Sequence, residues 1–276
     1  MAAENLIQVD QDKCTQCGYC VNVCRGTLGM GADGPEVIGD FCTACGHCVA
    51  VCPNNALDHR LAPLSKQIPI EKTPVLDADA AACFLRSRRS IRNFQKRCVP
   101  REKIRELLDV ARFAHTACNS QGVSYHVVDD PDALKGITSA IADWAENDLK
   151  HGALGKSPWS GNTANTIYCY REKKEDTILR NAPCLIIAMT DKERLALGRD
   201  NTHFALTYVQ LYAPTLGLGS CWSGLFEYCA SAKYEPLLKL LKLPKGKAVT
   251  GASLIGYPLY VFQKLVDRDS IDITWQ

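Results

Sequence analysis

Cysteine spacing is the strongest chemical signal in this chain of 276 residues. Eight of its 15 cysteines lie before residue 53, in two copies of the pattern C-x2-C-x2-C-x3-C, which read CTQCGYCVNVC and CTACGHCVAVC. Four thiolates in so short a segment suit a cubane iron–sulfur cluster, in which each sulfur binds a separate iron. A zinc site is the weaker alternative, because it needs two pairs of ligands separated by a longer loop.

The spacing resembles that of the two-cluster bacterial ferredoxins, in which three close cysteines bind one 4Fe-4S cluster and the fourth binds the other. The resemblance assigns cluster I to Cys14, Cys17, Cys20 and Cys52, and cluster II to Cys42, Cys45, Cys48 and Cys24. Gly18 and Gly46 allow each loop to turn tightly. His47 lies in the second loop, where it either tunes the cluster or faces solvent.

Charge and hydropathy limit the class of protein. The formal charge of +2 gives no sign of a nucleic-acid or membrane-surface partner. Residues 1–60 hold seven acidic and three basic side chains, so the rest of the chain carries +6, a contrast that suits electrostatic docking. The start of the chain lacks a signal-peptide pattern and no apolar run could span a bilayer, so we expect a cytoplasmic protein.

A GxGxxG string, GMGADG, occurs over residues 29–34. In a dinucleotide-binding fold this string joins a strand to a helix. Here it falls between the two cysteine motifs, with no room for either element. We therefore interpret it as glycine use in a connecting loop.

The pattern changes after Leu57, where three prolines and scattered charges predict a linker. We predict a cluster domain over 1–60, a linker over 61–80 and a second domain over 81–276. The segment from Pro100 has the apolar spacing of an amphipathic helix. Further helices are predicted over 132–150, 201–216 and 232–241, and strands at VSYHVVDD, PCLIIAMT and VTGASLIGY. Such a mixture indicates an α+β or α/β class.

A basic segment, RSRRSIRNF, lies near the start of the second domain. Its polar groups include Arg88, Arg89, Ser90 and Arg92. Guanidinium groups fork onto phosphate oxygens and a serine hydroxyl adds a short hydrogen bond, so the segment suits a phosphate. A solvated basic face is the other interpretation.

Four segments of this domain resemble the nitroreductase family of flavoproteins. They are RRSIRNF, HTACNSQGVSYHVV, LGLGSCWSGLF and GYPLYVFQKLVDR, in the order of the family, and the resemblance covers roughly residues 83–276. It implies an α+β fold, an FMN cofactor and a homodimer. Members fused to a ferredoxin domain exist in that family, which matches the organisation read from the cysteines.

The resemblance also implies roles for single residues. It places Arg88 and Ser90 at the flavin phosphate, Arg92 near the pyrimidine edge, and Asn119 at the isoalloxazine ring. Arg89, between the two phosphate positions, is a further cofactor-binding candidate of the basic segment. The backbone of Trp222, Ser223, Gly224 and Leu225 would meet flavin N5 and O4, and Lys264 or Arg268 would complete the phosphate site. A helix cap is the alternative for Asn119, and core packing for Trp222. Gly122 and Val123 stand where many members have Pro-Trp, so the pocket beside the flavin differs.

The function that follows is an FMN-dependent oxidoreductase that receives electrons through two 4Fe-4S clusters and reduces a nitroaromatic, a quinone or an enone. Flavin converts between one-electron and two-electron transfer, which explains why clusters and flavin would share a chain. A ferredoxin-like protein or a reductase would be the redox donor. The alternatives are a dehydrogenase or reductive dehalogenase of the same fold, and an electron carrier or redox sensor without turnover.

Overall fold

The computed structural model describes residues 6–24, 26–70 and 76–276. Contacts divide the chain into two compact units: unit 1 comprises Met1–Val75 with Cys118–Ser120, and unit 2 comprises Leu76–Ala117 and Gln121–Gln276. The division falls within the predicted linker, part of which, 71–75, lies outside the described residues. In the part of the chain that is described, no helix is both long and apolar enough to cross a bilayer.

Unit 1 is built from two similar halves. Its strands are β1 (Ile7–Val9), β2 (Leu28–Gly31), β3 (Gly34–Val37) and β4 (Leu57–His59), and its helices are α1 (Tyr19–Val23) and α2 (His47–Ala50). β1 pairs with β4 and β2 with β3, both antiparallel. Each helix follows a glycine with positive φ, 77° at Gly18 and 74° at Gly46, as the tight cysteine loops require.

The GMGADG string forms the β2–β3 hairpin. It therefore does not join a strand to a helix, and the interpretation as a connecting loop is confirmed.

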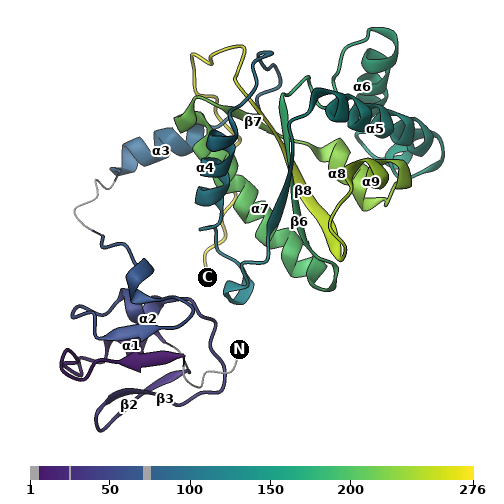
Figure 1. The fold of residues 1–276 in the computed structure, drawn as a ribbon. Coiled ribbons are helices and arrows are strands. Elements are labelled where there is room, and N and C mark those ends of the chain that lie inside the picture. The colour runs from purple at the N-terminus through teal and green to yellow at the C-terminus, as the bar shows by residue number, and fades with distance from the viewer. Residues whose placement is uncertain (1–5, 25, 71–75) are drawn as a thin grey trace. The chain divides into compact units, whose positions relative to one another are not determined.

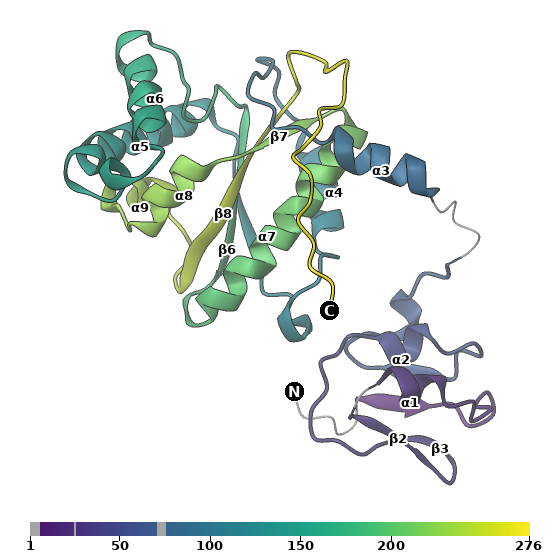
Figure 2. The same ribbon diagram turned by 180° about the vertical axis from the view of Figure 1, so that it is seen from behind.

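Unit 2 is an antiparallel sheet with helices on both faces (Figures 1 and 2). Its strands are β5 (Ser124–Val128), β6 (Cys184–Asp191), β7 (Gly219–Trp222) and β8 (Lys247–Gly256), in the order β5-β6-β8-β7. Its helices are α3 (Ala78–Ser87), α4 (Arg101–Ala111), α5 (Pro131–His151), α6 (Ser160–Glu172), α7 (Leu195–Tyr212), α8 (Gly224–Ser231) and α9 (Glu235–Leu241). The predicted α+β fold is confirmed.

The central strand β6 divides two hydrophobic cores. Leu185, Ile187 and Met189 pack into the core under α5, α8 and α9. The alternating residues, among them Ile186 and Ala188, pack against α4 and α7 on the opposite face. Side chains alternate across a strand, so the unbroken apolar run of β6 supplies both cores.

The predicted helices and the three predicted strands of the second domain are present, with shifted ends. The helix from Pro100 is α4, which buries Ile104, Leu107 and Ala111. The helix expected over 132–150 is α5, whose N-cap Asp130 accepts a 2.8 Å hydrogen bond from the Ala133 backbone N–H. α3 begins at Ala78, just before the end of the predicted linker. α3, α6, α8 and β7 were not expected from sequence.

Candidate functional site

The four cysteines assigned to cluster I come together in unit 1. Cys14, Cys17, Cys20 and Cys52 line one cavity with Met30, Pro35 and Leu57. Burial raises the pKa of the Cys20 thiol, and the charges of Cys52 and Cys17 add to the rise, so both thiols lie near it. The Cys52 sulfur also accepts a hydrogen bond of 3.2 Å from the Ala56 backbone N–H.

The four cysteines assigned to cluster II also come from both motifs, three from the second and one from the first. Burial raises the pKa of Cys48 to about 11, and the charges of Cys24, Cys45 and Cys42 raise it further. Cys24 therefore lies with the second motif although it belongs to the first. The Cys42 sulfur accepts a 3.3 Å hydrogen bond from the Ala44 backbone N–H.

The donor sets fit cubane clusters. Each site offers four thiolates, backbone N–H donors to sulfur, and partly buried surroundings. Among the described residues, no group of three or more His, Cys, Asp or Glu side chains could hold a single metal ion. A cubane does not need such a group, because its four thiolates bind four separate irons. The ligand roles of these cysteines stay predictions.

A histidine that the sequence did not single out lies beside the second set. His59 ends β4, is 1% exposed, and places Nε2 3.5 Å from the Cys42 sulfur. Burial lowers its pKa. His47, the histidine noted in the cysteine loop, is exposed. A histidine distant from the motif gives no spacing signal, so sequence alone could not have found His59.

In unit 2 the basic segment lies beside β7. Ser90 forms a parallel bridge with Ser220, and the Ile91 backbone N–H donates to the Ser220 carbonyl at 2.8 Å. β7 leads directly into Trp222 and α8. Two segments separated by 130 residues of sequence, both predicted to contact flavin, are thus neighbours in the fold.

Arg89 has the environment of an anion-binding group. Its Nη2 atom is buried and has no hydrogen-bond partner among the described residues. Its guanidinium carbon lies 5.8 Å from the centre of the Phe262 ring. A buried donor without a partner is costly, so this atom suits a phosphate oxygen. Arg88 and Ser90 are half-buried beside it in sequence, whereas Arg92 is exposed.

The side chain of Trp222, the last residue of β7, is fixed by contacts with α7 and α8. Trp222 Nε1–H donates to Glu227 Oε2 at 2.9 Å, and Arg199 pairs with the other oxygen of Glu227 at 3.1 Å. The His203 ring meets the indole edge-on at 5.1 Å. Ser223 is buried and its hydroxyl has no partner among the described residues. The indole thus packs against α7 and α8. The Ser223 backbone N–H donates to the Ala252 carbonyl at 3.0 Å, so within Trp222–Leu225 the N–H groups of Gly224 and Leu225, which begin α8 and have no intrahelical acceptor, are the part suited to a ligand.

Asn119 lies in a turn with unusual backbone geometry. Cys118, Asn119 and Gln121 all have positive φ, between 46° and 53°. Asn119 is grouped with unit 1, where its Nδ2 donates to the carbonyls of Thr43 and Ala44, both at 3.0 Å. α4 ends at Ala111, so Asn119 is not its cap. The predicted contact with the flavin ring stays a prediction.

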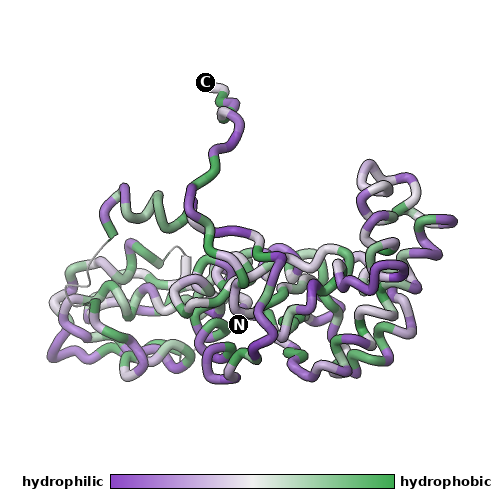
Figure 3. Tube along the Cα trace, turned by 90° about the horizontal axis from the view of Figure 1, so that it is seen from above, coloured by the Kyte–Doolittle hydropathy of each residue, from purple (hydrophilic) through white to green (hydrophobic). Residues whose placement is uncertain are grey.

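The C-terminal segment begins against the basic segment. The Gln95 backbone N–H donates to the Tyr257 carbonyl at 2.8 Å, and that of Leu259 donates to the Asn93 carbonyl at 2.9 Å. Beyond this contact the segment is irregular, and apolar and polar stretches alternate along it (Figure 3). Lys264 and Arg268 are both exposed there, and nothing distinguishes which of them would meet a phosphate.

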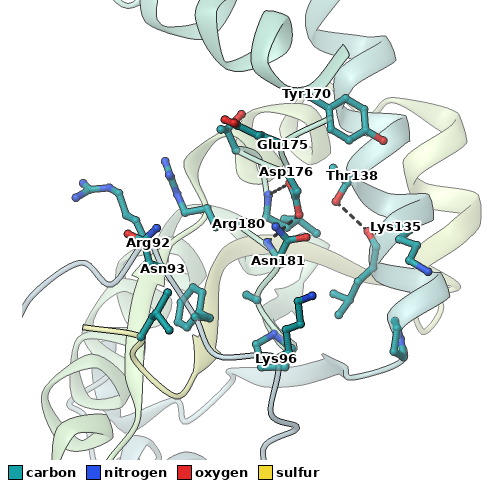
Figure 4. Close-up of a pocket in the computed structure, with 18 of the residues that line it drawn as sticks. Arg92, Asn93, Lys96, Lys135, Thr138, Tyr170, Glu175, Asp176, Arg180 and Asn181 are labelled. Carbon is teal, nitrogen blue, oxygen red and sulfur yellow. Dashed lines mark hydrogen bonds between the residues drawn. The ribbon is translucent and has the colours of Figure 1, made fainter. Parts of the chain in front are cut away.

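Arg92 lines a cavity of about 1210 Å³ in unit 2 (Figure 4). Arg92 and Arg180 extend on the same side of it, and Lys96 lies farther along. None of the three has an ion-pair partner among the described residues. The apolar side chains that line the cavity include Phe94, Leu134, Leu179 and Leu259.

The acids of this cavity are largely engaged elsewhere. Asp129 pairs with Arg101 at 2.8 Å, and Arg101 holds the pKa of that carboxyl below its ordinary value. Asp176 accepts backbone N–H groups from Ile178, Leu179 and Asn181 at 2.9–3.0 Å. With Glu175 as the remaining acid, the cavity presents an excess of positive charge.

Comparison with known proteins supplies the family. Residues 85–257, more than half of the chain, match the nitroreductase family. The chain belongs to the nitroreductase family. Residues 6–53 match the 4Fe-4S dicluster domain, so the predicted two-part organisation is confirmed. The dicluster match supports the two expected 4Fe-4S clusters, and solved nitroreductases of this fold contain the FMN that is expected here.

Individual relatives cover the nitroreductase part. A curated NADH dehydrogenase of Thermus thermophilus is 29% identical over 200 residues, which span 67% of this chain and 88% of the relative. A nitroreductase with bound FMN from Desulfitobacterium hafniense is 17% identical, covers 70% of this chain and 97% of its own, and has a TM-score of 0.56. Iodotyrosine deiodinase, bound to FMN and 3-iodo-L-tyrosine, is 18% identical over 71% of this chain and 98% of its own, also with a TM-score of 0.56. The two solved structures support the fold.

Proposed function

We propose that this member of the nitroreductase family is an FMN-dependent reductase that receives electrons through two 4Fe-4S clusters and delivers them to a small organic acceptor. The observation that carries the proposal is the union of two crossed four-cysteine sets and a nitroreductase unit in one chain. A flavoenzyme supplied directly by a nicotinamide has no need of iron. A ferredoxin-like protein or a reductase is the donor that such a chain requires.

Residues of unit 2 bind and orient the cofactor in this proposal. Arg88, Arg89 and Ser90 hold its phosphate, with the buried Nη2 atom of Arg89, which has no partner among the described residues, as the strongest support. The backbone at Trp222–Leu225 faces the ring system, steadied by the Trp222–Glu227 hydrogen bond. When bound, FMN would supply the conversion between one-electron and two-electron transfer.

The first experiment is anaerobic purification followed by analysis of iron, acid-labile sulfide and extracted flavin. About eight irons and one FMN per chain are expected. Reduction of a nitroaromatic, a quinone and an enone is then measured with a reduced one-electron donor. Full iron without flavin would overturn the reductase and leave an electron carrier or sensor. Including 3-iodotyrosine in the panel tests the dehalogenase alternative, which the fold shared with the deiodinase keeps in view.

The charged cavity bears on the class of acceptor. Lys96 and Arg180, beside an apolar lining, favour an acceptor with a carboxylate over a neutral one. We expect a higher kcat/KM for 4-nitrobenzoate than for 4-nitrobenzyl alcohol, and we expect Arg180→Gln to reduce this preference. Arg105→Gln, at an exposed position of α4, is the matched control. Equal rates for the two compounds in the wild type would overturn the preference but not the reductase.

A homodimer is also part of the proposal. Leu259, Val261 and Phe262 are exposed in the C-terminal segment, with Ile271 and Trp275 beyond them. Burying such side chains against a second copy would be favourable, since each fully buried one contributes about 1.5–3 kcal/mol. Light scattering should give twice the chain mass, and removing residues 259–276 should lower it. A monomer at micromolar concentration would contradict this part of the proposal.

A further inference from the structure

His59 is a buried polar side chain in a small unit. It is 1% exposed, and β4 fixes its backbone because His59 pairs with Ile7 of β1. Its Nε2 atom lies 3.5 Å from the Cys42 sulfur, within the range of a hydrogen bond to sulfur. The side chain therefore touches a predicted ligand of cluster II without belonging to the cysteine motifs.

The other ring nitrogen decides which atom carries the proton. His59 Nδ1 accepts hydrogen bonds from the backbone N–H groups of Leu61 and Ala62, both at 3.1 Å. An acceptor must present a lone pair, so the proton of the neutral ring is on Nε2. The Nε2–H group then donates to the Cys42 sulfur. Two backbone contacts thus fix the direction of the contact to sulfur.

The two predicted clusters differ in the side-chain hydrogen bonds that their cysteine sulfurs receive. His59 follows Cys42 by 17 residues, and the residue at the same distance after Cys14, its counterpart in the first motif, is Gly31. Each set has a backbone N–H donor to sulfur, from Ala44 to Cys42 and from Ala56 to Cys52. Glycine has no side chain to add another, so His59 distinguishes cluster II from cluster I at this position.

We propose that the hydrogen bond from His59 to the Cys42 sulfur raises the reduction potential of cluster II above that of cluster I. Reduction adds one electron to the cluster and spreads negative charge onto its sulfurs. A donor aimed at a sulfur stabilises that added charge, and hydrogen bonds to sulfur are among the determinants of cluster potential. Electrons entering unit 1 therefore collect on cluster II. The inference rests on cluster binding as proposed above.

Two substitutions separate this role from a structural one. In His59→Asn, the amide oxygen can still accept the Leu61 and Ala62 N–H groups, but the shorter side chain does not reach the sulfur. In His59→Gln, the longer amide can present an N–H group near the position of Nε2. His47→Asn is the matched control, because His47 is an exposed histidine in the loop of the same cluster.

The measurement is a voltammetric titration of each full-length variant under anaerobic conditions, after its iron and sulfide have been counted. For His59→Asn we expect the midpoint potential of one of the two one-electron waves to fall by about 59 mV, while that of the other does not change. At a fixed potential this shift makes the ratio of reduced to oxidised cluster about tenfold lower. His59→Gln should recover most of the shift, and His47→Asn should move neither wave. Unchanged waves in a His59→Asn chain with about eight irons would overturn this inference alone. A wild-type chain without iron would overturn it together with the proposed function.

Discussion

The two units reach a folded state by different physical means. Unit 2 has a sheet whose central strand feeds a core on each face, and these cores contain most of its large apolar side chains. Among the described residues of unit 1, the buried members of the principal core are Leu28, Val49 and Leu57 with Cys20 and Cys48, and partly buried side chains pack against them. A core of so few apolar side chains contributes little stability by burial, and small domains that bind metal often depend on it to fold.

The comparison implies that cluster assembly and folding are one event in unit 1, whereas unit 2 is stabilised by apolar burial. The chain offers a separate optical signal for unit 2, because its four tryptophans, at positions 144, 159, 222 and 275, all lie there. Iron and sulfide content report on unit 1. The difference between the units can therefore be tested within the intact chain.

The largest expected effect comes from removing one cluster ligand. Cys48→Ser should reduce iron from about eight to four or fewer per chain, because serine does not replace a buried thiolate ligand and unit 1 loses the cluster that stabilises it. Tryptophan fluorescence should still show a folded unit 2. Cys98→Ser, at an exposed cysteine of unit 2, is the control and should keep its full iron. Full iron in Cys48→Ser would refute the assignment of Cys48 as a cluster ligand.

The next effect concerns the core of unit 2. Ile187 in β6 is completely buried, so Ile187→Ala should lower the free energy of unfolding of this unit by about 2–5 kcal/mol through lost apolar contacts and the cavity left behind. Urea unfolding followed by tryptophan fluorescence measures it, and iron content should not change. Leu197→Ala, at a position of α7 that is 58% exposed, is the matched control. A parallel loss of iron would show that the two units do not fold separately.

The same contrast explains what the sequence revealed. The cysteine loops were predicted because their ligand geometry is local, and β6 because a run of six buried apolar residues, Cys184 to Met189, has few other interpretations. β7 was missed because GSCW is short and weakly patterned, and α6 because few of its side chains are buried. The contact of Arg89 with the Phe262 ring and the hydrogen bond from His59 to Cys42 depend on packing between segments far apart in the sequence, which no spacing rule encodes.

A smaller effect than those on iron content and core stability is expected for FMN affinity, to which the positive charge of Arg89 would contribute. Arg89→Gln should weaken FMN binding about 10- to 100-fold, the equivalent of about 1.5–3 kcal/mol for one hydrogen bond to a charged group. Fluorescence titration of flavin-stripped protein with FMN measures the dissociation constant, and Arg105→Gln is the exposed control. The cluster content should be the same in both variants. An unchanged affinity in Arg89→Gln would remove this residue from the phosphate site.

The smallest effect tests a surface pair of unit 2, which contributes little beside burial or metal ligation. A hydrogen bond from Arg101, with its charge, lowers the pKa of Asp129. A carboxyl with a lowered pKa in the folded state stabilises that state above its ordinary pKa of about 4, and this contribution is lost as the pH falls through the lowered value. Arg101 is largely exposed, so solvent screening keeps the contribution of this pair to stability small.

Arg101→Gln should therefore lower the free energy of unfolding of unit 2 by the same small amount at pH 7 and pH 5, and by less at pH 3. Urea unfolding followed by tryptophan fluorescence measures this difference from the wild type even where acid removes the clusters, because the signal comes from unit 2 alone. Lys135→Gln, which removes a still more exposed pair with Asp132, is the control and should have a smaller effect. A loss in Arg101→Gln as large as that in Ile187→Ala, or one that grows on acidification, would mean that charge rather than apolar burial stabilises unit 2.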